Sequence, residues 1–492
     1  MPGSERPELV LSGGLRVPQP DALLIGGAWR PSAAAARTPV ISPATETVVA
    51  EVAMATLADA DAAAAAAAEA FRGVWPRWPV ARRVEICSAF CARLEQHFDD
   101  FGMAWAIEAG MPLRWSRTLH RFAAKAAWST ALAVAEEALE PSLRSTPVGE
   151  LSLEHDPVGP VLAVMPYNGP LATIGSKVIP ALLAGASVVV KAAPESALTM
   201  RLVSACALEA GFPPGVLSIL PGGVEISRHL VRDPRFELIS FTGGPRAAID
   251  ILRESAERLP RTIFELGGKS PAVLLPDVDL EQALRSLVAG AMSGSGQICA
   301  ALSRLIVPRA RHDEIVEAVA GAYRRLRIGD PCAPDTDQGP LANREARERA
   351  QRFVATALEE GASLACGGGR PASQATGYYF EPTLLTGVRP GDTLAQEEVF
   401  GPVTAVLPYG DVDEAIAIAN DSDYGLAASV YSADRTRALA LARRIRAGSV
   451  AVNTFGPTMA APFGGVKRSG WGRECGPEGL REFTALKQIL SG

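Results

Sequence analysis

The fold class is decided by four apolar runs, GPVLAVMP (159–166), SVVVKAAP (187–194), VLSIL (216–220) and LISFTGG (238–244). Helical sequence separates these runs. Strands that alternate with helices at this spacing are typical of parallel βαβ units. Strands buried on both faces are expected to be continuously apolar, as VVV and VLSIL largely are. The sequence therefore predicts an α/β fold with a parallel sheet.

Sequence on the N-terminal side adds further elements. Residues 1 to about 20 hold four prolines and predict a loose leader, and LLIGGAW (23–29) predicts a short strand broken by glycine. The alanine-rich segment DADAAAAAAAEAF predicts a helix, with Thr56 or Asp59 as its cap. A second helix is expected from about Val80 to Glu108, where apolar residues recur every three or four positions.

On the C-terminal side, AVLLP (272–276) and RLIVP (304–308) begin a second alternation of helix and strand. A chain of 492 residues is too long for one compact core and predicts about three units. With 48 % hydrophobic and 21 % charged residues, a largely disordered chain is excluded.

Charge and cysteine content narrow the function classes. The net charge of −6 gives no basic footprint for nucleic acid or an anionic membrane. Seven scattered cysteines without a CxxC pair argue against a disulfide framework or a metal site. The N-terminus lacks the apolar region of a secretory signal, and no apolar run is long enough to span a membrane. We therefore expect a cytoplasmic protein.

Three polar residues are candidates for chemistry, and each has an ordinary structural interpretation when taken alone. Cys299 in SGSGQICAALSR is typical of a small buried residue, and Glu265 in FELGGKSP of a surface charge before a turn. Asn168 in MPYNGP is typical of a turn that ends a strand. The carboxyl end of a strand is, however, also where open α/β sheets bind ligands.

Taken together, seven motifs change this interpretation. They are, in chain order, MPYNGP, KAAPE, SFTGG, FELGGKSP, GQICAALSR, EEVFGPV and PFGGVKRSGWGRE. From about residue 20 to the C-terminus the chain resembles the NAD(P)-dependent aldehyde dehydrogenase superfamily. The resemblance implies an aldehyde dehydrogenase-like α/β fold with a Rossmann-type NAD(P)-binding domain, an α/β catalytic domain and a small oligomerisation β-element.

The resemblance also implies domain boundaries and a homodimer or homotetramer. The NAD(P)-binding domain is expected at 1–134 and 154–267, and the catalytic domain at 268–450. The oligomerisation and C-terminal segment is expected at 135–153 and 451–492, with 451–473 serving as a loop of the catalytic domain. The alternating segment LSLEHD (151–156) predicts an exposed strand whose edge a partner subunit would cover.

The family mechanism assigns roles to four residues. Cys299 matches the nucleophile, whose thiol, with an ordinary pKa of about 8.5, needs activation. Asn168 matches the amide that stabilises the thiohemiacetal oxyanion, and Glu265 matches the base that activates water against the thioester. Lys177 matches a lysine near this glutamate, as structural support or as a proton relay.

The cofactor site matches the family with departures. Lys191 fits the lysine of the adenosine ribose, but Pro194 stands where a glutamate is usual, and Glu195 follows one residue later. Gly244 replaces a usual serine. We therefore expect NAD or NADP, with NAD slightly favoured. The implied cofactor residues are Pro166, Tyr167, Lys191, Pro194, Glu195, Gly222, Phe241, Thr242, Gly243, Gly244, Leu266, Gly267, Glu398 and Phe400.

Small residues at the implied substrate wall predict a wide, apolar tunnel. The pocket positions are Ala123, Gly169, Ala172, Ser176, Ile298, Ala300 and Phe463. The expected substrate is thus a bulky apolar aldehyde, aromatic or long-chain. An Arg121 that pointed into the tunnel would instead favour an ω-carboxylate semialdehyde. The alternatives are a CoA-acylating semialdehyde dehydrogenase, which would not need Glu265, and a catalytically silent scaffold.

Overall fold

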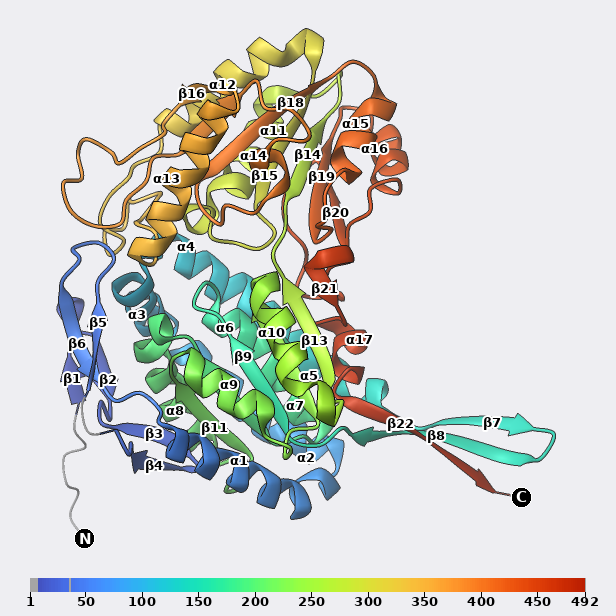
Figure 1. Ribbon diagram of the computed structural model, residues 1–492. Coiled ribbons are helices and arrows are strands. Elements are labelled where there is room, and N and C mark those ends of the chain that lie inside the picture. Colours follow the sequence, from blue (N-terminus) through green and yellow to red (C-terminus); the bar gives the residue numbers. More distant parts are fainter. Residues whose placement is uncertain (1–7, 35–36, 492) are drawn as a thin grey trace.

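The computed structural model describes residues 8–34 and 37–491, which form two α/β units and a projecting arm of strands (Figure 1). The first seven residues of the predicted leader lie outside these ranges. The remainder is not loose, because β1 (Glu8–Val10) and β2 (Arg16–Pro18) form an antiparallel hairpin and Val17 is buried in the core. A second hairpin, β5 (Thr38–Ile41) and β6 (Val48–Val52), follows it.

The first unit contains an eight-stranded sheet in the order β21-β13-β12-β9-β10-β11-β3-β4. Its five central strands are parallel, which confirms the βαβ prediction. These strands are β9 (Val161–Met165), β10 (Val188–Ala192), β11 (Leu217–Pro221), β12 (Leu238–Gly243) and β13 (Arg261–Leu266). Every residue of β9, β10 and β11 is buried, which explains their largely apolar sequence.

Helices cover both faces of this sheet (Figure 1). Val188 and Val190 pack in one core with α2, α5, α7 and α8, whereas Val189 packs on the other side with α1, α9 and α10. The bounds are α1 (Leu57–Arg72), α2 (Val80–Gln96), α5 (Lys125–Leu139), α7 (Ile179–Ala184), α8 (Ala197–Ala210), α9 (Val224–Arg232) and α10 (Pro245–Ser255).

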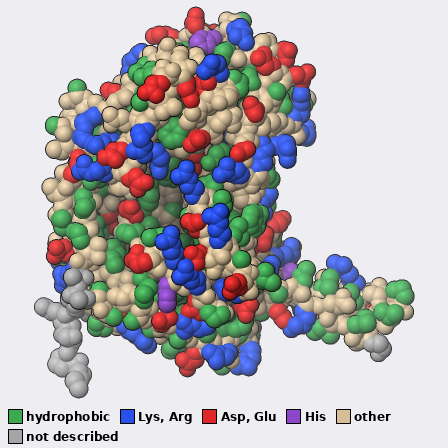
Figure 2. All heavy atoms as spheres, viewed as in Figure 1, with side chains coloured by type: hydrophobic (Ala, Val, Ile, Leu, Met, Phe, Trp, Pro, Cys, Tyr) green, Lys and Arg blue, Asp and Glu red, His purple; other side chains and the backbone are tan. Residues whose placement is uncertain are grey.

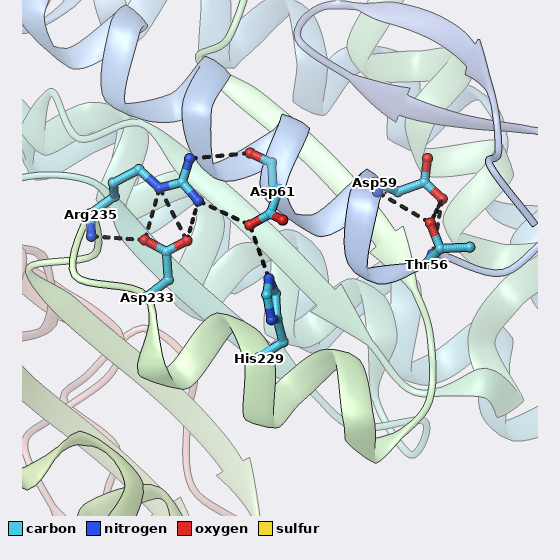
Figure 3. A network of polar contacts seen from close by, with 6 residues as sticks. All are labelled: Thr56, Asp59, Asp61, His229, Asp233 and Arg235. Atoms are coloured by element: carbon cyan, nitrogen blue, oxygen red, sulfur yellow. Dashed lines mark hydrogen bonds and ion pairs between the residues drawn. The ribbon is translucent and has the colours of Figure 1, made fainter.

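The start of α1 is fixed by a capping box. The Thr56 hydroxyl accepts from the Asp59 backbone, and the Asp59 carboxylate accepts from the Thr56 backbone at 2.9 Å, as Figure 3 shows. The predicted cap is therefore confirmed. One turn later, Asp61 binds His229 of α9 at 3.0 Å and Arg235 at 3.3 Å. These contacts hold α1 against α9 and against the loop that follows α9.

Two local expectations are wrong. LLIGGAW is not one broken strand but a hairpin of β3 (Ala22–Ile25) and β4 (Ala28–Pro31), because Gly26 and Gly27 both adopt the positive φ that a tight turn requires. The helix expected from 80 to 108 is two helices, α2 and α3 (Phe98–Ala109), with His97 between them at φ −108° and ψ 18°. Apolar periodicity did not reveal this break because both helices face one core.

Short helices lie around the carboxyl end of β9. They are α4 (Leu113–Thr118), a π-helical segment at Leu119–Ala124, α6 (Pro170–Thr173) and a second π-helical segment at Ile174–Val178. Single π-helical turns are rare and concentrate at functional sites.

The second unit holds a seven-stranded sheet in the order β16-β17-β18-β15-β14-β19-β20. All its strands are parallel except β16. They are β14 (Ser270–Leu274), β15 (Leu302–Pro308), β16 (Ser363–Cys366), β17 (Thr383–Thr386), β18 (Val403–Tyr409), β19 (Ala427–Tyr431) and β20 (Ser449–Val452). Helices again cover both faces: α11 (Leu280–Met292) and α12 (His312–Arg324) on one, and α13 (Arg344–Glu359), α14 (Thr393–Gln396), α15 (Val412–Asn420) and α16 (Arg435–Ala442) on the other.

The arm is a three-stranded sheet in the order β22-β8-β7 that projects from the body (Figure 1). Its strands are β7 (Ser142–Thr146), β8 (Gly149–Pro157) and β22 (Thr484–Ser491). The segment LSLEHD is a strand, within β8, but it lies in the middle of the sheet, so its edges are already paired. The open edges belong to β7 and β22, because the distant C-terminus supplies the third strand.

Two of the implied domain boundaries fall inside elements of the structure. Residue 135 falls inside α5, which continues to Leu139 and packs against α17 (Gly476–Arg481), and residue 450 falls inside β20. The segment after β20 returns to the first unit, where β21 (Gly470–Trp471) pairs with β13. Among the described residues, no helix has the length and apolar character needed to cross a membrane.

Candidate active site

The strand order of the first sheet sets where a ligand can bind. From β9 the chain builds β10 and β11 on one side and then β12 and β13 on the other, so the order reverses between β9 and β12. Open α/β sheets bind ligands at the carboxyl ends of strands beside such a reversal. Asn168 follows β9, Thr242 lies near the end of β12, and Glu265 lies near the end of β13. The topology thus brings three distant motifs to one edge.

The loop that carries Cys299 has an unusual backbone. After α11, Gly294, Ser295 and Gly296 all have positive φ, at 58°, 58° and 72°. Ser295 tolerates this conformation because its hydroxyl donates to the Gly339 carbonyl at 2.9 Å. Three left-handed residues in a row turn the chain sharply, which directs Cys299 toward the carboxyl end of the first sheet.

Gln297 holds this loop in place, a role that the sequence analysis did not assign. Its side-chain oxygen accepts from the Tyr167 hydroxyl at 3.2 Å and from the Ala342 N–H at 3.1 Å. Its backbone carbonyl accepts from the Asn168 side chain at 2.8 Å. The glutamine is visible in the GQIC motif, but its hydrogen-bond partners are known only from the tertiary structure.

Cys299 and Glu265 lie side by side. Burial raises the pKa of the Cys299 thiol well above its usual value, and the neighbouring Glu265 raises it further. Burial also raises the pKa of Glu265 to about 8, with repulsion from Glu474 as the next cause. Glu265 is 3 % exposed, and its Oε1 atom has no hydrogen-bond partner among the described residues. This carboxyl is therefore available to a bound molecule such as water.

Asn168 lies beside the nucleophile loop. One hydrogen of its amide is used by the Gln297 carbonyl, and the second is left for a ligand. Asn168, Cys299 and Glu265 line the same cavity. An amide fixed in this way is pre-organised to donate to an oxygen on the substrate.

Lys177 does not contact Glu265 but is linked to it through Glu474. The fully buried Lys177 ammonium pairs with the Glu474 carboxylate and donates to the Ser240 hydroxyl at 3.1 Å. Glu474 itself lines the cavity. The positive charge of Lys177 lowers the pKa of Glu265, which partly offsets the effect of Glu474. Glu474 lies in the quoted motif GWGRE, yet its position beside Glu265 follows only from the fold.

A cavity of about 330 Å³ opens onto Cys299. All seven residues of the implied substrate pocket line it: Ala123, Gly169, Ala172, Ser176, Ile298, Ala300 and Phe463. Further walls that the sequence analysis did not name are Trp105, Trp115, Leu119, His120, Phe455 and Met459. Arg121 does not line the cavity, because its guanidinium lies at the surface, 3.3 Å from Asp99.

The implied adenosine end of the cofactor site lies at the ends of β10 and β11. Lys191 is buried there, and burial lowers its pKa to about 8, while Glu195 and Glu225 act in the opposite direction. Pro194 begins the short turn after β10. The Glu195 carboxylate is engaged elsewhere, as it accepts from the Asn343 side chain at 3.0 Å. The Gly222 N–H, just after β11, donates a hydrogen bond to the Ala192 carbonyl at the end of β10 at 3.2 Å, and this bond links the two strand ends.

The middle of this site is the N-terminus of α10, which has no side-chain cap. Gly244 stands there, and a Cβ atom added to it would meet nothing within 4 Å. The buried Thr242 hydroxyl has no partner among the described residues. The adjoining ends of β12 and β13 contribute the other implied residues, Phe241, Gly243, Leu266 and Gly267. Free helix N–H groups beside an open space suit a phosphate.

The implied nicotinamide end lies nearer the second unit. The Glu398 carboxylate accepts from the Gly268 N–H at 2.9 Å, and burial raises its pKa to about 7. Phe400 has a positive φ of 53°, and its ring meets Tyr167 edge to face at 6.5 Å. Pro166, next to Tyr167, also lines the cavity. In the described ranges, no group of three His, Cys, Asp or Glu side chains is arranged to hold a metal ion.

Comparisons with known proteins show which family the chain is similar to. The model of the aldehyde dehydrogenase family matches residues 29–489. Geranial dehydrogenase of Castellaniella defragrans is 37 % identical, over 95 % of this chain and 98 % of its own. The 3-succinoylsemialdehyde-pyridine dehydrogenase of a Pseudomonas species is also 37 % identical, over 95 % and 97 %. An aldehyde dehydrogenase of Mycobacterium tuberculosis complexed with NAD⁺ has a TM-score of 0.93 at 39 % identity, over 96 % of this chain and 98 % of its own. The chain therefore belongs to the aldehyde dehydrogenase family.

Proposed function

We propose that the protein oxidises bulky, apolar aldehydes to carboxylic acids, with NAD preferred over NADP. The observation that carries this proposal is a cysteine in contact with a buried glutamate at the inner end of an apolar cavity. The glutamate also argues against transfer of the acyl group to CoA, because that route needs no base for water. The test is to incubate the enzyme with NAD and an arylaldehyde, without CoA, and to detect reduced cofactor and carboxylic acid in equal amounts.

In the first step the Cys299 thiol loses its proton to solvent, the sulfur attacks the aldehyde carbon, and the carbonyl electrons move to oxygen. Asn168 then donates its second amide hydrogen to the resulting oxyanion. One such donor is typically worth about 3 kcal/mol in the transition state. Bound NAD would accept the hydride released when this oxyanion collapses, which leaves the acyl group on Cys299 as a thioester.

In the second step Glu265 takes a proton from water, and the hydroxide displaces the Cys299 thiolate as the carboxylic acid forms. The unpartnered Oε1 of Glu265 is the acceptor for that proton. Lys177 contributes through its pairing with Glu474, because its charge keeps the pKa of Glu265 from rising further. Its part is thus electrostatic and supporting in this mechanism.

The residues present fit a dinucleotide. Lys191 would hold the adenosine ribose, the N-terminus of α10 with Thr242 and Gly243 the pyrophosphate, and Glu398 with Phe400 the nicotinamide ribose and ring. Thr242 supports this assignment because its buried hydroxyl has no hydrogen-bond partner in the part of the chain that the structure describes. A relative of known structure binds NAD⁺.

We expect a relaxed cofactor preference, with NAD favoured and NADP still used. Pro194 removes the carboxylate that would repel a 2′-phosphate, and Glu195 is held by Asn343. Lys191 remains to attract the phosphate, without an arginine to clamp it. The ratio of kcat/KM for NAD over NADP should lie below about a thousand. A larger ratio would show that another group excludes NADP, and Glu225→Gln is the first variant to measure in that case.

The small residues at the cavity wall should determine the ranking of aldehydes. Each additional buried methylene stabilises binding by about 0.8 kcal/mol, or roughly fourfold. Hexanal and arylaldehydes should therefore exceed acetaldehyde in kcat/KM. Gly169 has an extended backbone, at φ −170°, and an added Cβ would meet only Ala172 at 3.8 Å. Gly169→Phe is thus sterically tolerated by the fold but should fill the cavity.

In Gly169→Phe the preference for bulky aldehydes over acetaldehyde should fall by about tenfold or more. Initial rates with acetaldehyde, hexanal, benzaldehyde and succinate semialdehyde measure this ranking. If acetaldehyde is the best substrate of the unmodified enzyme, or if Gly169→Phe leaves the ranking of bulky aldehydes unchanged, the wide-tunnel assignment is wrong.

We also propose that the protein forms a homodimer or homotetramer through the arm. Its open strand edges and exposed apolar residues, among them Leu143 at 77 % and Leu486 at 68 % exposure, are features that a partner normally covers. Figure 2 shows apolar side chains along the projecting arm. All seven cysteines are free, which supports the expectation of a reducing, cytoplasmic compartment.

A further inference from the structure

His120 is a polar side chain in the wall of the substrate cavity that the mechanism does not use. His120 lines the cavity and is 1 % exposed. It lies in the π-helical segment Leu119–Ala124, between α4 and α5. Such segments concentrate at functional sites, since they displace one residue from the regular helical pattern.

Neither ring nitrogen of His120 has a hydrogen-bond partner among the described residues. Burial lowers its pKa to about 4; the Phe98 carbonyl acts in the opposite direction but lies outside hydrogen-bonding geometry. The imidazole is therefore neutral near pH 7 and has one N–H donor and one nitrogen acceptor. A buried polar group without a partner is costly and rare, so a partner is expected in the working enzyme.

The position of this ring is fixed relative to the reacting atoms. His120 stacks on Trp105, with the ring centroids 5.1 Å apart and the planes at 22°. The Trp105 indole N–H donates to the Tyr167 carbonyl at 2.8 Å, and Tyr167 immediately precedes Asn168. The imidazole is thus connected through two packed groups to the proposed oxyanion donor.

The protein around His120 has little to offer as a partner. The cavity walls beside it are Leu119, Ala123 and Trp115, and the indole N–H of Trp115 already donates to the Asp337 carbonyl at 3.2 Å. Phe98 stacks on the imidazole at 6.2 Å and Phe101 meets it edge to face. Apart from the Phe98 backbone, which raises the pKa of His120, these neighbours provide no hydrogen-bonding group, so a molecule bound in the cavity can supply the partner.

We propose that His120 is a specificity-determining residue, which exchanges a hydrogen bond with an uncharged hydroxyl group on the aldehyde. The preferred substrate is then a bulky apolar aldehyde that carries one hydroxyl, such as a hydroxylated arylaldehyde, rather than a pure hydrocarbon. A hydroxyl suits a neutral imidazole because it can donate to the ring nitrogen or accept from the ring N–H. This inference rests on the proposed aldehyde oxidation and narrows its substrate class.

The test compares kcat/KM for benzaldehyde with that for its ortho-, meta- and para-hydroxy derivatives, in the unmodified enzyme and in His120→Phe and His120→Gln. The unmodified enzyme should prefer one hydroxylated isomer over benzaldehyde by about 10- to 100-fold, since a site that hydrogen-bonds a hydroxyl discriminates against its absence. His120→Phe keeps the stacking on Trp105 and removes both nitrogens, so the ratio should fall to about one. His120→Gln keeps donor and acceptor and should retain an intermediate preference.

The ratio is the readout because a general loss of activity cancels in it. His97→Phe is the matched control: its ring lies at the surface beside Asp100, 2.9 Å away, and its removal should leave the ratio unchanged. Equal kcat/KM for benzaldehyde and all three derivatives in the unmodified enzyme, or an unchanged preference in His120→Phe, would overturn the inference. If His120→Phe does not fold, His120→Gln decides instead. A reduced preference in His120→Gln supports the inference, and an unchanged preference overturns it. If none of the aldehydes is oxidised, the proposed function itself fails and the inference falls with it.

Discussion

Replacing Cys299 by alanine should abolish aldehyde oxidation, with kcat reduced by about 10⁴-fold or more, because the thioester forms on the Cys299 sulfur. Cys299 is the cysteine that lines the cavity next to Glu265 and Asn168. The change removes one sulfur from a partly exposed position, so the fold and the binding of NAD should persist. Initial rates with an arylaldehyde, together with the melting temperature and NAD binding, measure the three properties.

Cys332→Ala is the matched control. Cys332 is also partly exposed, but it lies outside the residues that line the cavity, in the turn after Asp330. The same chemical change there should leave kcat within about twofold, as is usual for substitutions away from a site. Substantial oxidation by Cys299→Ala, with acid formed in step with reduced cofactor, would show that the nucleophile has been assigned wrongly.

Glu265→Gln should separate the two halves of the reaction. Hydrolysis of the thioester needs a base, so steady-state turnover should fall by about 10²- to 10⁴-fold. The first half should still occur, and reduced cofactor should appear in a burst of about one per active site. The charge of Glu265 raises the pKa of Cys299, so a neutral glutamine does not oppose thiolate formation. Stopped-flow absorbance of the reduced cofactor measures both phases.

The pH dependence gives a second readout for Glu265. Its pKa is raised to about 8, so the carboxyl is mostly protonated at pH 7 and acts as a base only as the pH rises toward that value. Steady-state kcat should therefore increase from pH 6 to about 8 in the unmodified enzyme, and this increase should disappear in Glu265→Gln. The exposed Glu257→Gln is a control for the same substitution elsewhere. Equal slowing of burst and steady state in Glu265→Gln would remove the assignment to deacylation.

Much of the site was predictable because its chemistry lies in short motifs. MPYNGP, FELGGKSP and GQICAALSR each carry one of the three reacting residues within three positions of a glycine, and the three residues meet in the fold. The small side chains of the substrate wall were predictable for the same reason, because Gly169, Ala172 and Ser176 follow Asn168 within one short stretch. Their assignment needed only the resemblance and the order of the motifs.

Other residues of the site could not be assigned from their sequence neighbourhood. Glu474 and Lys177 are 297 positions apart, and their pairing depends on the return of the C-terminal segment to the first sheet at β21. His120 stands in an unremarkable helical sequence, and its proposed role depends on a π-helical turn and on two ring nitrogens that have no hydrogen-bond partner among the described residues. Gln297 forms hydrogen bonds with two segments that are remote in the chain, Tyr167–Asn168 and Ala342.

The sequence by itself determined the α/β class, the parallel strands from 159 to 244 and the residues expected to react, because strand burial and turn chemistry leave local patterns of apolar residues, glycine and proline. The tertiary structure alone decided that α2 and α3 are separate helices, that LSLEHD lies in the middle of the arm and that Glu474 and His120 face the cavity. Those features depend on contacts between segments far apart in the chain. A local pattern records which face of an element is buried, but not which distant segment covers it.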